Sequence, residues 1–230
     1  MRIVTWNCAR GPLTKKLDAL HTLKPDVAIL CEAPPPACES NTVAWFQSDA
    51  RSGKTGVQVR TYGDYSLERL PTADLSRCVN PIRVCGSVSF NLLAVWTWKA
   101  PSYVKAFLNG LDAYSHLLES GPCVVTGDFN GNPKYDKPRQ VIKWGDAFNR
   151  LDELGLVSAY HQSKGLAYGA EYENTHRHKR ITDPLHHLHI DYCFIPNEWI
   201  NDDFSIKIES TDTWAALSDH YPIVVDVTLA

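Results

Sequence analysis

The sequence PCVVTGDFN, residues 122–130, joins an apolar run of strand length to a short polar ending. Its valines and threonine favour a buried β-strand, and the glycine, aspartate and asparagine that follow favour the end of one. Asp128 and Asn130 are two residues apart, so in extended backbone they project to the same side. Taken alone, this ending is also compatible with an ordinary turn.

Polar groups of the same chemical kind border apolar runs in four other segments. These segments are Thr5-Trp6-Asn7, Cys31-Glu32, His189-Ile190-Asp191 and Ser218-Asp219-His220. Gathered in one pocket, the carboxylates of the five segments would repel one another unless a cation or an imidazolium shared their charge. Carboxylates, a side-chain amide and an imidazole form the ligand set of Mg²⁺ or Mn²⁺ with a place for a phosphate oxygen. The pattern therefore predicts a divalent-metal phosphoesterase site.

The order and local sequence of these segments resemble the endonuclease/exonuclease/phosphatase superfamily, the DNase I-like and exonuclease III-like enzymes. The resemblance spans residues 7–220, and its most specific parts are GDFN and the SDH triplet that YPI follows. It implies an α/β (α+β) four-layer sandwich, in which two packed, mainly antiparallel β-sheets are flanked by helices. The chain departs from the family at Cys31, where glutamine is usual, and at residues 95–98, VWTW, where many relatives have a histidine or tyrosine.

The resemblance implies catalytic roles for four residues. Asp128 would orient or deprotonate the attacking water, and Asn130 would hold the phosphate or the nucleophile. His220 would contact the scissile phosphate as an imidazolium, while Asp191 would fix its tautomer and raise its pKa. Together they describe phosphodiester hydrolysis by direct attack of water.

The resemblance also implies Mg²⁺ or Mn²⁺ as cofactor. Glu32 would be the main ligand, with Asn7 and Asp219 beside it. Asn7 would hydrogen-bond the main ligand or bind the metal through its carbonyl; the alternative is that it only caps a strand end. Asp219 and His220 are adjacent, so a shared site requires them to lie in a turn and not in a regular strand.

A histidine-rich basic stretch precedes Asp191. It comprises HRHKR at residues 176–180 and HHLH at 186–189. We expect His176, Arg177 and His189 to bind substrate phosphates, since His189 would share a strand face with Asp191. A separate zinc site and a merely solvated loop are the alternatives. Trp98 is a further candidate, as a platform for stacking a base or as ordinary core.

Composition favours one domain, residues 1–230, with a single core. No apolar run is long enough for a signal-peptide core or a membrane span, so we expect a cytoplasmic protein. Seven cysteines without a Cys-x-x-Cys pair favour reduced, buried thiols. The net charge of −3 argues against a broadly basic surface but leaves room for a local one. Neither a membrane nor an obligate protein partner is expected.

The apolar pattern predicts many strands and a few long helices. A helical spacing of leucines at residues 13–23 separates two strand-like runs, in β-α-β order. Helices are also expected at residues 101–118 and 140–154. Strands are expected at residues 2–7, 27–31, 43–47, 56–62, 65–69, 82–90, 92–98, 122–126, 189–195, 204–208 and 223–229.

The resulting prediction is a metal-dependent phosphoesterase, with a nuclease acting on DNA or RNA as the first choice. A phosphatase or phosphodiesterase acting on a small molecule, an inositol phosphate or a phospholipid headgroup is the alternative enzyme. A basic groove several nucleotides long would favour the first, and a short closed pocket the second. A catalytically inactive binding module is the alternative from another class, although a scaffold has no physical need for mutually repelling carboxylates.

Overall fold

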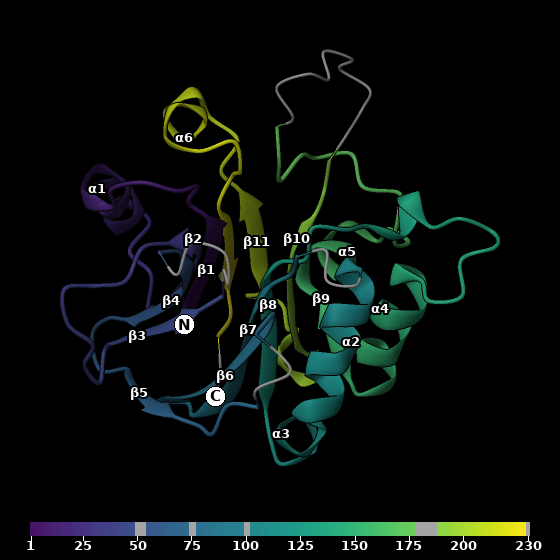
Figure 1. The fold of residues 1–230 in the computed structure, drawn as a ribbon, viewed down its shortest axis with the longest axis horizontal. Helices are drawn as coiled ribbons and strands as arrows, with labels where there is room; N and C mark the ends of the chain where they lie inside the picture. The colour runs from purple at the N-terminus through teal and green to yellow at the C-terminus, as the bar shows by residue number, and fades with distance from the viewer. Residues whose placement is uncertain (49–53, 74–76, 99–101, 178–187, 229–230) are drawn as a thin grey trace.

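Two six-stranded β-sheets pack face to face in the computed structural model, and helices cover their outer faces (Figure 1). The structure describes residues 1–48, 54–73, 77–98, 102–177 and 188–228. Within these ranges, no helix is both long and apolar enough to cross a membrane. The layers confirm the predicted four-layer α/β sandwich.

The first sheet has the strand order β11-β12-β1-β2-β4-β3. Its strands are β1 (Arg2–Asn7), β2 (Val27–Ala33), β3 (Val43–Gln47), β4 (Gly56–Thr61), β11 (Ser205–Ile208) and β12 (Ile223–Asp226). Strands β1 and β2 are parallel, as expected for strands joined through helix α1 (Thr14–Thr22), and the other neighbours are antiparallel.

The second sheet has the strand order β5-β6-β7-β8-β10-β9. Its strands are β5 (Ser66–Arg69), β6 (Val79–Cys85), β7 (Phe90–Trp96), β8 (Cys123–Asp128), β9 (Leu156–Ser158) and β10 (Asp191–Pro196). Only β7 and β8 are parallel to each other, so both sheets are mainly antiparallel, as predicted.

Strand side chains alternate between a core inside the sandwich and a core under the helices. In β7, Leu92 and Ala94 face the first sheet, while Leu93 and Val95 face the helical layer. Because both faces are covered, the central strands read as continuous apolar runs. The same alternation operates in the first sheet.

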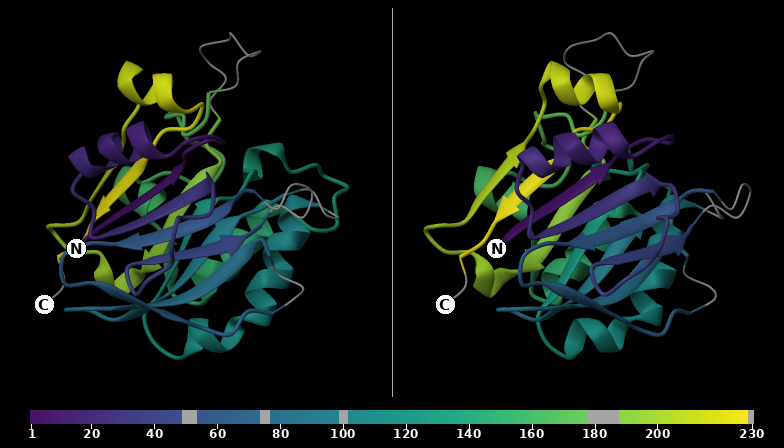
Figure 2. Two further views of the ribbon diagram at one scale, coloured as in Figure 1. Left: turned by 60° about the vertical axis from the view of Figure 1, so that its left-hand side comes forward. Right: turned by 90° about the vertical axis from the view of Figure 1, so that its left-hand side faces the viewer.

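Helices α2 (Tyr103–Ala113) and α4 (Trp144–Glu153) cover the second sheet. Helices α1 and α6 (Asp212–Leu217) cover the first, and Figure 2 shows them side by side in purple and yellow. The remaining short elements are α3 (Ser115–Glu119), η1 (Pro133–Tyr135), α5 (Ala159–Lys164) and η2 (Asn197–Trp199).

Several predicted element boundaries are wrong. The helix expected over 101–118 is interrupted at Tyr114, which leaves helical geometry and whose buried hydroxyl accepts a hydrogen bond from the backbone of Ala73. The helix expected from residue 140 begins at Trp144, because the Asp136 carboxylate accepts from the first backbone amides there. The strand expected over 82–90 gives way to a bend after Cys85. Elements β9, α5 and α6 are too short to leave a periodic signal.

Candidate active site

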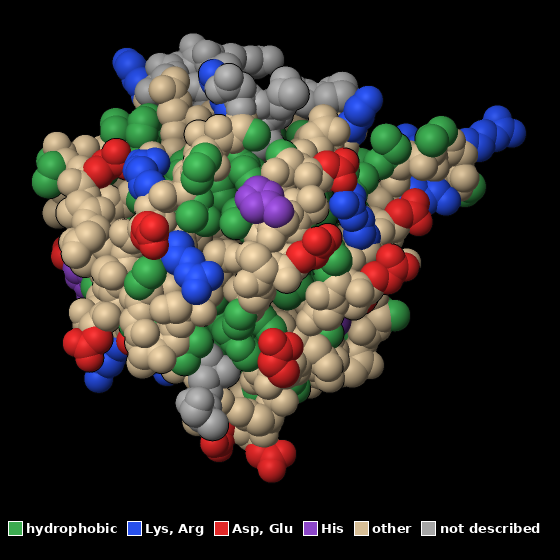
Figure 3. All heavy atoms as spheres, turned by 90° about the horizontal axis from the view of Figure 1, so that it is seen from below, with side chains coloured by type: hydrophobic (Ala, Val, Ile, Leu, Met, Phe, Trp, Pro, Cys, Tyr) green, Lys and Arg blue, Asp and Glu red, His purple; other side chains and the backbone are tan. Residues whose placement is uncertain are grey.

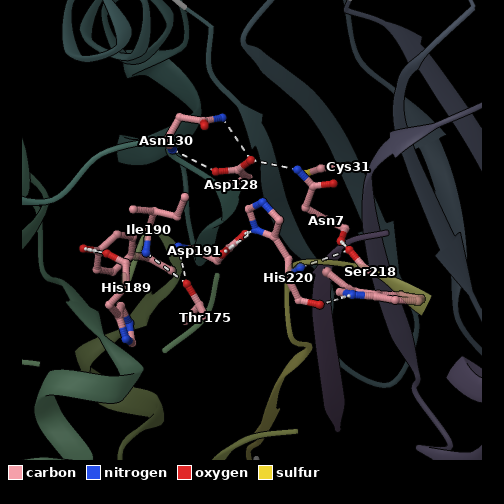
Figure 4. Close-up of polar contacts among 12 residues, drawn as sticks. Asn7, Cys31, Asp128, Asn130, Thr175, His189, Ile190, Asp191, Ser218 and His220 are labelled. Carbon is pink, nitrogen blue, oxygen red and sulfur yellow. Dashed lines mark hydrogen bonds and ion pairs between the residues drawn. The ribbon is translucent and has the colours of Figure 1, made fainter. Parts of the chain in front are cut away.

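The polar strand ends meet at one rim of the sandwich. Asn7 at the end of β1 lies opposite Cys31 in β2, and Asp128 at the end of β8 lies opposite Asp191 at the start of β10. Strands β1 and β2 also contact β8 across the two sheets. The two sheets therefore present their carboxylates and amides to one another at this rim (Figure 4).

Asp128 is buried and held by three nitrogen donors. The Asn130 backbone N–H donates to Oδ1 at 2.8 Å, and Asn130 Nδ2 donates to Oδ2 at 2.9 Å. Asn7 Nδ2 also donates to Oδ2, at 2.9 Å. The Thr97 carbonyl accepts a second hydrogen bond from Asn130 Nδ2 and so anchors that amide. The carboxylate of Asp128 is thus fixed in place before any substrate arrives.

Glu32 reaches the rim through an irregularity in β2. The register between β2 and β4 shifts between Leu30 and Ala33, and Glu32 itself has φ of +59°. A bulge of this kind redirects a side chain that regular alternation would send elsewhere. Asn7 Nδ2 donates to Glu32 Oε1 at 3.3 Å as well as to Asp128, so one amide joins both carboxylates.

Backbone strain is concentrated at this rim. The described residues include four non-glycine residues with positive φ, and three of them are Glu32, Asn130 at +50° and Ala9 at +53°. The Ala9 backbone N–H donates to Asn7 Oδ1 at 3.0 Å, so the strained backbone at Ala9 also positions a site residue. Such conformations cost on the order of 1–3 kcal/mol each and persist where the surrounding structure imposes them.

His220 and Asp191 form a buried pair. The Nδ1 nitrogen of His220 lies 2.9 Å from Asp191 Oδ2 and 3.2 Å from Oδ1, which leaves Nε2 for other partners. The His220 backbone N–H donates to Ser218 Oγ, and its carbonyl accepts from Trp6 Nε1. The Thr175 hydroxyl accepts from the Asp191 backbone N–H at 3.1 Å. Asp219 lies in a bend and His220 in an isolated β-bridge, so neither belongs to a regular strand.

Electrostatics at the rim reflect two buried carboxyl groups facing one imidazole. Burial would lower the pKa of His220, but the Asp191 carboxylate outweighs it and raises this pKa to about 9. Burial, followed by repulsion from Asp191, raises the pKa of Asp128 to about 7. Near neutral pH, His220 is therefore the proton donor of the set and Asp128 the group able to accept a proton.

The donor set fits a divalent cation. Glu32 and Asp128 offer hard carboxylate oxygens, which Mg²⁺ and Mn²⁺ prefer. Both carboxylates lie close to the Asn7 side-chain amide. Two buried carboxyl groups share a single protonated imidazole, and Glu32 adds a further charge that Arg10 faces across 3.5 Å at the exposed surface. The excess negative charge is what a divalent cation would offset.

Three predicted residues lie beside this set. Among the described residues, two groups of histidine and carboxylate side chains could hold an ion: Asp128, Asp191 and His220 in one, and His176, Asp219 and His220 in the other. Asp219 is thus grouped with His176 and not with Glu32. Arg177 is exposed, and its side chain donates to the Ala215 carbonyl.

Trp98 is half-buried two residues beyond the end of β7, and its ring packs edge-on against Trp96 with the centroids 6.0 Å apart. It follows Thr97, whose carbonyl anchors Asn130. This placement is compatible with a stacking platform. The predicted basic residues at 178–180, His178, Lys179 and Arg180, lie outside the described residues.

His189 is not brought into the site. Only 1 % of its surface is exposed, and its ring points away from His220 (Figure 4). Its Nδ1 donates to the Glu173 carbonyl at 3.0 Å, and its ring packs against Tyr160. The predicted face sharing with Asp191 fails because β10 begins only at Asp191, so strand alternation does not extend back to residue 189. In this arrangement His189 cannot reach a substrate.

Four residues to which the sequence assigned no role support the site. They are Ala9, Thr97, Thr175 and Ser218. Ser218 belongs to a recognised triplet and could have been assigned a role, since its hydroxyl donates to the Asn7 carbonyl at 2.8 Å. The other three act through backbone groups or through a hydroxyl distant in sequence, and no motif marks them.

No protein-family model and no curated protein sequence matches the chain. Solved structures do share its architecture. AP endonuclease LMAP from Leishmania major superposes with a TM-score of 0.71 at 16% identity, over 100% of this chain and 88% of that one. The 3′ phosphatase NExo from Neisseria, bound to a product DNA hairpin, gives 0.69 at 16% identity over 100% of both chains. An AP endonuclease from Archaeoglobus fulgidus gives 0.66 at 16% identity, also over 100% of both. The chain therefore has the DNase I-like fold of the endonuclease/exonuclease/phosphatase superfamily, as its motifs predict.

Proposed function

We propose that this protein is a Mg²⁺- or Mn²⁺-dependent phosphoesterase that hydrolyses phosphodiester bonds, with DNA or RNA as its substrate. The observation that carries the proposal is the convergence of the Asp128 carboxylate and the Asp191–His220 pair at one rim. Groups able to accept a proton, donate one and hold a cation meet where strands of both sheets end. That combination is what hydrolysis of an anionic ester by water requires.

Each residue has a distinct part in the proposed reaction. Asp128, held by Asn7 and Asn130, orients the attacking water and accepts its proton. His220 donates a hydrogen bond from Nε2 to a phosphate oxygen, and Asp191 keeps the ring oriented and protonated. Asn130 adds a polar contact near the phosphate.

Glu32 is the proposed principal metal ligand. The side-chain carbonyl of Asn7 and the carboxylate of Asp219 are proposed as further oxygen donors. When bound, the cation supplies charge for the phosphate and lowers the pKa of a bound water. Glu32 suits this role because it is only half-buried and its carboxylate is positioned by Asn7. Asp219 is grouped with His176 and His220, so an Asp219→Asn variant tests its part in binding the metal.

A polymeric substrate is supported by the proteins that share this fold. An AP endonuclease and a 3′ phosphatase bound to a DNA hairpin share this fold. Acidic and basic side chains are interspersed on the face in Figure 3, so this face offers no broad basic surface to nucleic acid.

The test is hydrolysis by the purified protein of supercoiled plasmid, single-stranded DNA, RNA, bis-p-nitrophenyl phosphate and p-nitrophenyl phosphate. Each substrate is incubated with Mg²⁺, with Mn²⁺ and with excess EDTA. We expect cleavage of at least one nucleic acid, dependent on metal and abolished by EDTA. Full activity in EDTA would contradict the metal role. Preference for p-nitrophenyl phosphate over every diester would instead support a small-molecule phosphatase.

A further inference from the structure

His176 lies beside His220, although the two are far apart in sequence. Their backbones form an isolated antiparallel pair, in which Arg177 N–H donates to the Asp219 carbonyl and Tyr221 N–H donates to the Thr175 carbonyl, both at 2.7 Å. The two imidazole rings lie 4.4 Å apart between centroids. Backbone pairing therefore holds the imidazoles together.

Asp219 completes a set of three ligands. One ligand atom from each of His176, Asp219 and His220 lies within 4.8 Å of the others. His176 and Asp219 are half-buried and His220 is buried, so the set opens to solvent on one side. The neighbouring group of Asp128, Asp191 and His220 is wholly buried.

The donor chemistry of this set differs from that of the proposed cofactor site. Two imidazoles and one carboxylate match the ligands of zinc with an open position, whereas carboxylate and amide oxygens suit Mg²⁺ and Mn²⁺. Asp191 also holds His220 through Nδ1, which leaves Nε2 for an ion. A carboxylate behind the far nitrogen is the usual way in which proteins orient a metal-binding imidazole.

We propose that His176, Asp219 and His220 form a binding site for Zn²⁺ or a similar transition-metal ion, separate from the oxygen donors of Glu32 and Asp128. His220 Nε2 serves either this ion or a phosphate oxygen, and Asp219 serves either this ion or the metal proposed beside Glu32, but not both. Occupation of the site therefore withdraws His220 from the substrate and inhibits hydrolysis. The binding proposal stands by itself, and only the inhibition rests on the proposed function.

The experiment measures metal binding directly. Zn²⁺ is titrated into metal-free protein against a chromophoric chelator, with Mg²⁺ present so that Zn²⁺ does not bind at the Glu32 and Asp128 oxygens. A Cys38→Ser background removes the exposed thiol at that position as a competing ligand. We expect one Zn²⁺ per protein, and His176→Ala and Asp219→Asn should each raise Kd at least ~10-fold, the lower limit seen even when a partner behind a ligand is lost. Co²⁺ should give visible d–d bands that the same changes weaken.

Matched controls separate this site from other ligands. His116→Ala replaces an exposed histidine in α3 and should leave Kd unchanged. The triple change of His178, His186 and His187 to Ala, outside the described residues, should also leave it unchanged. His176→Gln, with folding checked by circular dichroism, replaces His176→Ala if the latter unfolds.

Three results would overturn the proposal. They are absence of Zn²⁺ binding, binding indifferent to His176 and Asp219, and binding lost only in Glu32→Gln or in the triple variant. Zn²⁺ binding by a protein that cleaves no phosphodiester would leave this site intact and reject the proposed function instead. Cleavage of a phosphodiester by a protein that binds no Zn²⁺ would reject this site and leave the proposed function intact.

Discussion

His189 and His220 are both buried and both lie near Asp191, yet their pKa values move in opposite directions. Burial lowers the pKa of His189 to about 4. Burial acts on His220 too, but the Asp191 carboxylate at 2.9 Å raises its pKa to about 9. His189 donates to a neutral carbonyl, and its Nε2 has no hydrogen-bond partner among the described residues.

The contrast shows that a charged partner can outweigh the effect of burial on the pKa of an imidazole. A carboxylate makes His220 a stable imidazolium suited to an anionic ester. Burial keeps His189 a neutral ring packed among aromatic side chains, because its carbonyl partner favours the charged form too weakly to offset the loss of solvent. The sequence predicts a phosphate contact for both histidines, and the structure supports it only for His220.

The largest expected effect follows removal of the proton acceptor. Asp128→Asn keeps the size of the side chain but cannot accept a proton from water. We expect kcat for metal-dependent diester cleavage to fall by ~10²–10⁴. Single-turnover rates with a labelled oligonucleotide measure this, with circular dichroism as the check on folding. Turnover near that of the wild type would reject Asp128 as the base.

Asp191→Asn should remove most of the difference in pKa between His220 and His189. Without the carboxylate, we expect the pKa of His220 to fall by roughly 1–3 units, since an opposite charge at this distance shifts a pKa by that much. NMR titration of the imidazole in metal-free protein measures the value. A pKa that stays near 9 would mean that another group protonates His220.

The same pair has a consequence for stability. Because the pKa of His220 is raised in the folded protein, the stabilisation is fully present below about pH 6.5 and is lost as pH rises through about 9. Urea unfolding between these values should show a decline in the wild type that Asp191→Asn lacks. An unchanged slope in the variant would contradict the assignment.

His189 should act in the opposite pH range. Its pKa is lowered in the folded protein, so the protein loses stability as pH falls from about 6.5 toward 4, by about 3 kcal/mol. His189→Gln should flatten this loss in urea unfolding measured at a series of pH values. Equal acid sensitivity in the variant would assign the effect to other groups.

The smallest effect concerns Arg177, an exposed cation at the rim. If nucleic acid is the substrate, Arg177→Ala should reduce the dependence of log K on log salt by about 0.9 for duplex DNA. Fluorescence anisotropy at several salt concentrations measures the slope, and Lys105→Ala is a matched exposed control in α2. An equal reduction by both changes would argue against a specific contact.

The sequence predicts most of the fold because the central strands are apolar on both faces and the turns between them are short. It also predicts that Asn7, Asp128, Asp191 and His220 meet, since each ends or borders such a strand. The short elements β9, α5 and α6 were missed because so few residues show no helical or strand periodicity in their apolar side chains. The interruption at Tyr114 depends on a tertiary hydrogen bond that local propensity cannot show.

The orientation of individual side chains was less predictable. Glu32 reaches the rim only through a bulge in which its own φ is positive. The neighbouring sequence does not predict this bulge. His189 was misplaced because β10 starts two residues later than the apolar pattern suggests. The pairing of His176 with His220 joins segments distant in sequence, so only the structure reveals it.

Comparison of the two histidines in one reaction tests the central claim most directly. Wild-type protein, His220→Ala and His189→Gln are assayed for plasmid cleavage in Mg²⁺ under single-turnover conditions near neutral pH, with circular dichroism as the check on folding. We predict a loss of ~10²–10⁴ in rate for His220→Ala and a rate within a few-fold of the wild type for His189→Gln. Equal losses in the two variants, or none in His220→Ala, would contradict the account.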